Sequence, residues 1–133
     1  MRELLERFRP ALGVLDEGTS LAVDGDALVV VFASGRRQRI HVRIRDDDYV
    51  FTSRVLGATR VAALGWGELA DIVWSRNRST PLVTFMLDEA GRLVGRVEQP
   101  SATMDPPELR AIVLLLAREC DRLEYLRTGR DDQ

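Results

Sequence analysis

The sequence predicts an α+β fold in which a largely antiparallel sheet packs against helices. The periodic segments follow in the order α-β-β-β-α-β-β-α, without the strand–helix alternation that builds parallel sheets. The chain of 133 residues is most simply one domain, so we expect residues 1–133 to fold as a single unit. Hydrophobic residues make up 45% and charged residues 30%, a composition that supports a core without disulfides or metal.

A short helix opens the chain. Apolar residues recur at helical spacing from Leu4 to Leu12 and predict a helix over residues 2–9. Pro10 should end or kink that helix, because proline has no amide hydrogen to donate. Residues 16–20 are rich in turn formers, and we expect a loop there.

Three or four strands come next. Residues 21–23 form a possible short strand, and residues 27–33 contain the apolar run LVVVF of a strand buried on both faces. Residues 36–45 form the next predicted strand, because Ile40, Val42 and Ile44 alternate there with polar residues, which indicates a strand with one solvated face. After the acidic turn Asp46-Asp47-Asp48, residues 49–56 form the next predicted strand.

The second half predicts a helix, a hairpin and a long final helix. Residues 57–64 are irregular or lead into a helix over 65–77. Strands at 82–87 and 93–99 follow, joined by a turn in which Gly91 suits the left-handed position.

The final helix has clear boundary signals. It should run from Pro106, a favoured first helical residue, to about Thr128, with Gly129 as its stop. Asp105 is placed to cap its start, and Glu108 three residues later completes a capping box.

Composition excludes several classes of protein. The net charge of −2 argues against a protein built as a whole to hold a polyanion, although all 19 basic residues are arginine. The single Cys120 excludes an internal disulfide and favours a reducing compartment. No apolar run reaches the length of a membrane span and the N-terminus lacks a signal peptide, so we expect a cytoplasmic protein without membrane contact.

The residues that could carry catalysis are few. His41 lies among arginines without metal-ligand partners at suitable spacing, and Cys120 suits a buried position on the last helix. Asp46-Asp47-Asp48 could bind a divalent cation, but successive residues of one turn rarely converge on one ion. We therefore predict no catalytic residue, no metal site and no cofactor.

One strand face carries the most conspicuous charge. Arg39, His41, Arg43 and Arg45 alternate along the strand and place cations about 6.5 Å apart on one face. The stripe could meet an acidic peptide or a nucleic-acid backbone, or it could be a solvent face paired with acids on neighbouring strands. The net acidity and the lack of interleaved aromatic residues make nucleic acid the weaker of the two partners.

The last helix is apolar on more than one side. One stripe suits packing on a sheet and contains Leu109, Ile112, Val113, Leu116, Cys120, Leu123 and Arg127. Leu114, Leu115 and Leu126 lie outside it, which implies burial on another side, either under the N-terminal helix or in a subunit interface or partner groove. Trp66 and Trp74 are expected in the core.

Three local features together resemble the YbjN family, which shares its fold with type III secretion chaperones. The first is the strand–turn–strand from Arg39 to Phe51, with DDDYVFTSRV at its end. The second is a helix that ends in Trp74-Ser75-Arg76-Asn77 before the hairpin LVTFMLDEAGRLVGRV. The third is the final helix with Asp121-Arg122-Leu123-Glu124.

The resemblance implies a non-enzymatic, chaperone-like module that forms a homodimer and binds extended segments of partner proteins. It also implies a regulatory role in stress responses and brings no catalytic residues. We therefore predict a protein- or peptide-binding module, with the Arg39/His41/Arg43/Arg45 face as the partner site and Leu114, Leu115 and Leu126 as the interface. A nucleic-acid-binding module that uses the same strand face is the alternative.

Overall fold

A computed structural model describes residues 2–16 and 18–128 of the chain. The elements, in chain order, are α1 (Arg2–Phe8), the 3-10 turn η1 (Arg9–Ala11), β1 (Gly13–Asp16), β2 (Thr19–Asp24), β3 (Ala27–Val31), β4 (Arg37–Arg45), β5 (Asp48–Leu56), α2 (Ala58–Leu64), α3 (Trp66–Ser79), β6 (Thr84–Leu87), β7 (Leu93–Pro100) and α4 (Pro106–Thr128). The predicted α+β class with an antiparallel sheet is confirmed.

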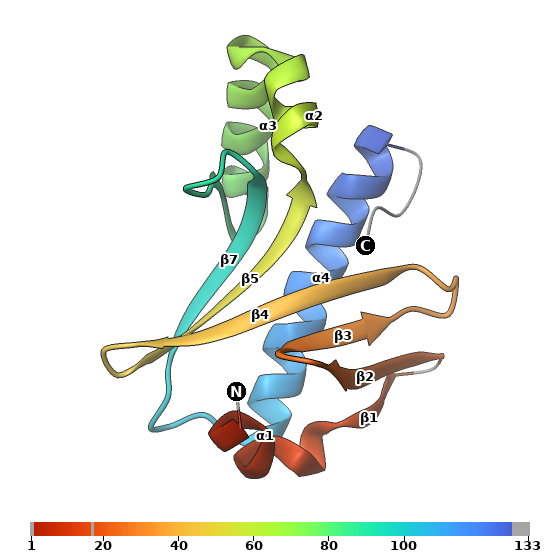
Figure 1. Cartoon of the computed structure of the whole chain (residues 1–133), viewed down its shortest axis with the longest axis vertical. Coiled ribbons are helices and arrows are strands. Elements are labelled where there is room, and N and C mark those ends of the chain that lie inside the picture. The colour runs from red at the N-terminus through yellow and green to blue at the C-terminus, as the bar shows by residue number, and fades with distance from the viewer. Residues whose placement is uncertain (1, 17, 129–133) are drawn as a thin grey trace.

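One antiparallel sheet organises these elements. Its seven strands follow the order β1-β2-β3-β4-β5-β7-β6, so β1 and β6 are its edges. The helix α4 crosses one face of the sheet, which we call the inner face, while α2 and α3 lie beyond the end of β5 (Figure 1). The opposite, outer face is not covered by any helix of residues 2–16 and 18–128 (Figure 1).

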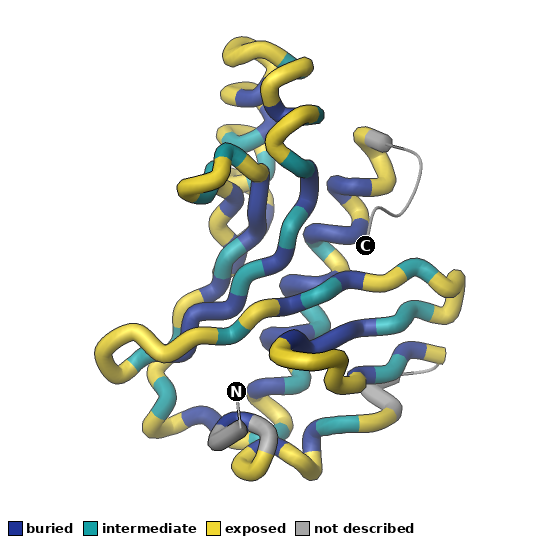
Figure 2. The backbone as a smooth tube through the Cα atoms, in the orientation of Figure 1, coloured by how far each residue is buried: buried dark blue, intermediate teal, exposed yellow. Residues whose placement is uncertain are grey.

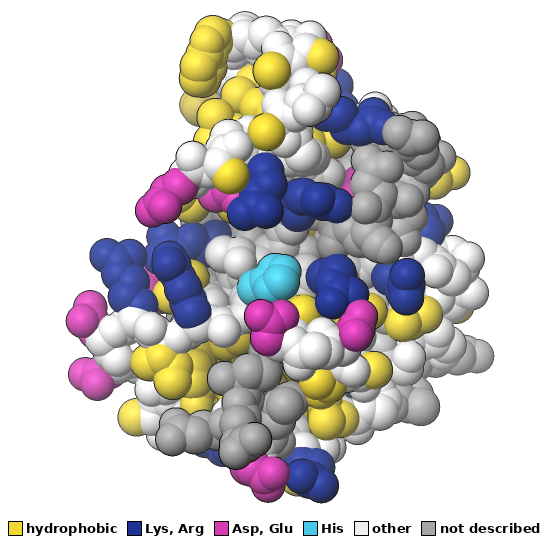
Figure 3. Space-filling model, viewed as in Figure 1, with side chains coloured by type: hydrophobic (Ala, Val, Ile, Leu, Met, Phe, Trp, Pro, Cys, Tyr) yellow, Lys and Arg dark blue, Asp and Glu magenta, His cyan; other side chains and the backbone are white. Residues whose placement is uncertain are grey.

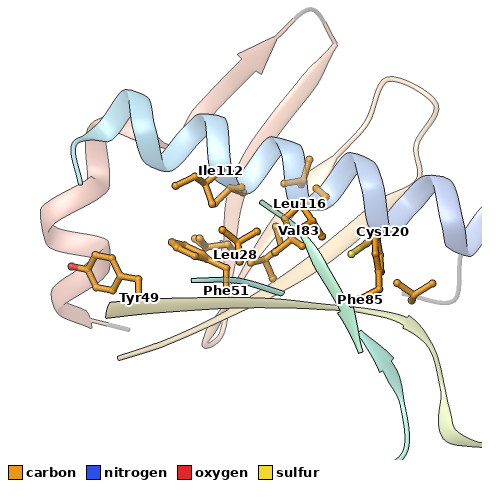
Figure 4. Close-up of a cluster of buried hydrophobic side chains, with 14 of the residues drawn as sticks. Leu28, Tyr49, Phe51, Val83, Phe85, Ile112, Leu116 and Cys120 are labelled. Carbon is orange, nitrogen blue, oxygen red and sulfur yellow. The ribbon is translucent and has the colours of Figure 1, made fainter. Parts of the chain in front are cut away.

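The core lies between α4 and the inner face. Apolar side chains of α4 such as Leu116 point toward Leu28 and Phe51 of the sheet (Figure 4). The predicted stripe of the last helix is buried from Leu109 to Leu123, whereas Arg127 is exposed. The N-terminal helix closes one end of this core, where the rings of Phe8 and Tyr49 meet edge to face at 6.0 Å.

The start of α4 follows the predicted capping chemistry. Asp105 Oδ1 accepts a hydrogen bond from the Glu108 amide at 2.9 Å, and Pro106 occupies the first helical position. The helix then approaches β7 closely at Gly95. A β-carbon there would lie 2.5 Å from Cys120 Sγ, so only glycine fits this crossing.

The N-terminal strands differ from the prediction. The expected loop at residues 16–20 is wrong, because β1 and β2 form a hairpin there, with Gly18 at φ 73°. The possible short strand at 21–23 is the middle of β2. The signal was weak because β1 is a four-residue edge strand that begins with glycine.

Two boundaries in the second half also move. Residues 58–64, expected to be irregular or an approach to a helix, form the separate helix α2. The strand expected to begin at Leu82 begins at Thr84, because Leu82 has φ 73° and breaks the extended backbone. The tube in Figure 2 shows that α2 and α3 are exposed over most of their length, unlike the central strands and α4.

Candidate protein-binding surfaces

The outer sheet face carries the predicted arginine stripe. Gln38 and Ile40 of β4 are buried on the inner face, where Gln38 Nε2 donates a hydrogen bond to Glu124 Oε1 of α4 at 2.9 Å. Because side chains alternate along a strand, the odd-numbered residues of β4 lie on the outer face. The stripe of Arg39, His41, Arg43 and Arg45 therefore shares one uncovered face, as predicted.

Strand register extends this stripe into a wider basic surface. His41 lies opposite Thr52 of β5, and Thr52 lies opposite Arg96 of β7. Arg54 lies opposite Val94, on the same face. The space-filling view looks onto this face and shows arginine side chains on both sides of the histidine and above it (Figure 3). We call Arg37, Arg39, His41, Arg43, Arg45, Arg54 and Arg96 the basic face.

The charges of the basic face are only partly neutralised. Arg39 pairs with Asp24 of β2 at 2.6 Å, and Arg96 pairs with Glu98 at 3.2 Å. Within residues 2–16 and 18–128, the exposed side chains of His41, Arg43 and Arg45 have no hydrogen bond or ion pair. Pairing with acids on neighbouring strands thus explains Arg39. Within the described residues Arg43 and Arg45 make no direct ion pair, although Asp48 of β5 lies opposite Arg45 in the strand register.

The Arg39–Asp24 pair shows how an arginine of the basic face changes the pKa of a neighbouring carboxyl group. The hydrogen bond from Arg39, and then its charge, lower the pKa of Asp24 below its usual value. Asp24 therefore stays ionised, and Arg39 holds a carboxylate at the rim of the basic face. The pair gives a local example of the chemistry that a partner carboxylate would meet at Arg43 or Arg45.

Arg96 has an incompletely satisfied guanidinium. Its Nε is buried and has no hydrogen-bond acceptor among the described residues, while its Nη2 reaches Glu98. A buried donor without an acceptor costs free energy, and arginine offers five donors in a fixed fork. Sequence reasoning missed Arg96 and Arg54, because only strand pairing places them beside β4.

The catalytic candidates lie apart from one another. His41 is exposed on the outer face, whereas Cys120 is fully buried on the inner face with its Sγ 3.8 Å from the Ser53 carbonyl. Burial raises the pKa of the Cys120 thiol far above its usual range, so the thiolate nucleophile is suppressed. The prediction that Cys120 is a buried apolar-like residue is confirmed.

The acidic turn shows no metal-binding arrangement. Asp46 and Asp47 form the β4–β5 turn, and Asp48 begins β5. Among the residues that the structure describes, no group of three acidic, histidine or cysteine side chains converges as metal ligands would.

The described helices also include none with the length and apolar character needed to cross a membrane.

The leucines predicted for an interface differ in exposure. Leu114 and Leu115 are half-buried and pack against the core. They belong to α4, which is also in contact with η1 near the N-terminus. Leu126 is 65% exposed. It lines an open groove of about 530 Å³ between α3 and the end of α4, which the Arg127–Glu68 ion pair bridges at 3.1 Å.

Both tryptophans are on the surface. Trp66 is 79% and Trp74 64% exposed, so their expected place in the core is wrong. The buried face of α3 is formed by Leu69 and Ile72 instead. Trp74 stacks with the guanidinium of Arg78 at 4.3 Å, one helical turn later. An exposed tryptophan pair on a protruding helix is typical of an interaction surface.

Chains of known structure from type III secretion complexes share this architecture. A chain of the heterodimeric ExoU–SpcU complex from the type III secretion system of Pseudomonas aeruginosa matches with a TM-score of 0.56 and 18% identity, over 90% of each chain. A chain from the ExsC–ExsE complex matches with a TM-score of 0.53 and 18% identity, over 80% of each chain. The likeness establishes the fold.

A third structure agrees with the first two. It contains the Yersinia pestis type III secretion chaperone SycH in complex with a stable fragment of YscM2, and it matches with a TM-score of 0.53 and 18% identity, over 91% of this chain and 97% of that one. The predicted secretion-chaperone fold is thus confirmed. No family model and no curated protein matches the chain, so membership of the YbjN family stays a prediction.

Proposed function

We propose that this protein is a non-enzymatic, chaperone-like module that binds an acidic, extended segment of a partner protein on its basic face. The observation that carries the proposal is the uncovered outer sheet face, where His41, Arg43 and Arg45 have no polar partner within residues 2–16 and 18–128. Positive charges held together on one rigid sheet face attract the carboxylates of a partner and steer their approach.

The geometry of the face favours an extended segment. The stripe runs along β4, a strand of nine residues whose side chains point alternately to the inner and the outer face. Carboxylates that alternate along an extended partner would match this spacing of about 6.5 Å. Arg96 lies two strands away on the same face, and its guanidinium could donate a hydrogen bond to a further carboxylate oxygen.

The fold supports a protein partner. The three solved structures compared above are a heterodimeric complex, an ExsC–ExsE complex and a chaperone bound to a fragment of YscM2. A chaperone-like role would use binding alone, which suits a chain whose one histidine and one cysteine lie on opposite faces of the sheet. A regulatory role in stress responses and a cytoplasmic location belong to the same proposal.

Nucleic acid is the less suitable polyanion. Register places Val50, Thr52, Val94 and Arg96 beside the stripe on the outer face. None of these is aromatic, whereas proteins that bind single strands stack bases on aromatic side chains. The exposed tryptophans lie on α3, away from β4.

The decisive experiment removes Arg43 and Arg45, which have no hydrogen bond or ion pair with the part of the chain that the structure describes. Immobilised wild-type protein and R43S/R45S would capture partners from lysate of the native cell, and a fluorescent polyglutamate peptide would report direct binding. Two rim charges contribute roughly 0.5–1 kcal/mol each at low salt, so we expect about tenfold weaker binding of the peptide. The difference should shrink as salt screens the charges.

The matched control removes two arginines elsewhere. R9S/R122S changes the net charge equally on η1 and α4, where both side chains are exposed. It should bind the peptide as wild type does. Equal binding by R43S/R45S and wild type would remove the charge role, and stronger retention of a single-stranded oligonucleotide than of polyglutamate would favour the nucleic-acid alternative.

We also propose that two copies of the chain form a homodimer. The α3 helix supports this, because it exposes Trp66 and Trp74 and projects beyond the sheet (Figure 1). Of the predicted interface residues, Leu126 faces α3 across the groove and could extend such an interface. Leu114 and Leu115, which are half-buried, would add little contact area.

A further inference from the structure

The strand β6 is an edge of the sheet. It pairs with β7 on one side, with Phe85 opposite Gly95, and none of the strands that the structure describes lies on its other side. An edge of this kind exposes amide hydrogens and carbonyls that invite pairing with another chain. Exposed apolar side chains, Met86 and Leu82, lie in or next to β6 and would favour such pairing.

The middle of this edge is already occupied. Asn77, in the last turns of α3, accepts a hydrogen bond at its Oδ1 from the Phe85 amide at 2.7 Å. Its Nδ2 donates to the Phe85 carbonyl at 3.1 Å. Both backbone groups of Phe85 are therefore taken by one side chain.

The carboxamide does what a neighbouring strand would do. In an antiparallel pair, a hydrogen-bonded residue exchanges one N–H···O bond in each direction with the residue opposite. Asparagine and glutamine carry a donor and an acceptor side by side, which matches that exchange. In β6, Asn77 stands in the place of the opposite residue of an added strand.

We propose that Asn77 closes the β6 edge to strand addition, so that other chains reach this end of the molecule only through side-chain contacts. A second copy of the chain would otherwise be the readiest partner, since β6 can pair antiparallel with its own copy across a two-fold axis. The proposal does not depend on the partner of the basic face.

The test first removes the Asn77 side chain from the β6 edge and then blocks strand pairing there with a lysine instead. Asn77→Ala removes both hydrogen bonds, and we expect it to associate beyond the wild-type state in sedimentation velocity, with loss of at least about tenfold amide-exchange protection at Phe85. In N77A/M86K the exposed Met86 becomes a lysine, which blocks edge pairing. This double variant should sediment as wild type, as should M86K alone.

Ser79→Ala serves as the matched control. Ser79 lies in the same turn of α3, and within residues 2–16 and 18–128 its hydroxyl donates hydrogen bonds to the Ser75 and Arg76 carbonyls of its own helix. It should change neither measurement.

Three results would overturn the proposal. A folded N77A that sediments as wild type would show that the edge needs no closure. Association that M86K does not reverse would show that another surface is responsible. Rapid exchange of the Phe85 amide in the wild-type protein would show that Asn77 does not protect the backbone of the edge. This measurement needs no variant, so it tests the proposal even if N77A does not fold.

Discussion

Gly95 and Cys120 set the distance between the sheet and its covering helix. A β-carbon at residue 95 would lie 2.5 Å from Cys120 Sγ, closer than real contacts allow, and 3.1 Å from Leu116 Cδ1, which is a tight contact. Because protein interiors are packed as densely as organic crystals, neither neighbour can move away freely. This contact could not be predicted from sequence, since Gly95 and Cys120 meet only after β7 and α4 have packed.

Gly95→Ala should lower the free energy of unfolding by about 1–3 kcal/mol, the usual cost of overpacking a core. Urea denaturation would measure it. Cys120→Ala removes the sulfur that the new methyl would meet, so G95A/C120A should lose less than the sum of the single variants. Gly67→Ala is the control, because a β-carbon there meets nothing within 4 Å. Additive losses at residues 95 and 120 would contradict the steric account.

Cys120 should also make stability depend on pH. Burial raises the pKa of its thiol, so the folded state keeps the proton that the unfolded state releases above about pH 8.5. The stabilising contribution is therefore complete below that pH, and is lost by roughly 1.4 kcal/mol per pH unit above it. The unfolding free energy of wild type, measured from pH 7 to 10, should fall more steeply than that of C120A. Parallel curves would contradict this role of burial.

At the scale of elements, α4 is fixed on the sheet by polar contacts as well as by its apolar stripe. Gln38 of β4 donates to Glu124 at 2.9 Å and accepts from Ser53 of β5 at 2.7 Å. Glu124 is 1% exposed, and a buried carboxylate must be hydrogen-bonded to be tolerated. Beside it, Arg36 forms a two-pronged pair with Asp121 and lies 4.6 Å from the Tyr125 ring.

Gln38→Leu should lower the free energy of unfolding by about 1–3 kcal/mol, because Glu124 and Ser53 each lose a buried partner. Q38L/E124L removes the carboxylate as well, so it should be more stable than the two single losses predict. Chemical denaturation of wild type, Q38L, E124L and Q38L/E124L would measure the coupling between the two residues. A cycle without coupling would show that the buried contact contributes no specific stability.

The strands that the sequence predicted best are the strongly patterned ones. The alternation in β4 and the apolar run in β3 follow directly from which faces are buried, and the cap of α4 follows from Asp105 and Pro106. The hairpin of β1 and β2 lacked such a pattern. Trp66 and Trp74 were misplaced because nothing in the sequence shows that α3 extends past the sheet and needs only Leu69 and Ile72 for packing.

At the scale of the whole molecule, the two tryptophans report on assembly. They are the only tryptophans of the chain, and both lie exposed on α3. If α3 forms the proposed dimer interface, iodide should quench their fluorescence strongly in dilute protein and weakly at high concentration. Light scattering should then give twice the monomer mass of 15.0 kDa at high concentration.

W66Q/W74Q tests the same interface by removing it. This variant should remain at the monomer mass, because two large apolar anchors are lost from exposed positions that the fold does not need. Ile44→Gln removes an equally exposed apolar residue from the tip of β4 and should leave the mass unchanged. A clean monomer of the wild-type protein at high concentration would reject the dimer.

The helix that covers the inner face is also the last element of the described chain. During synthesis on the ribosome, all seven strands emerge before α4, which ends at Thr128. Until that helix arrives, Leu28, Phe51 and Phe85 have no layer to pack against. The nascent chain therefore displays a long apolar surface, and because the stabilising contacts are distant in sequence, folding should be slow and completed only after residue 128 has left the exit tunnel.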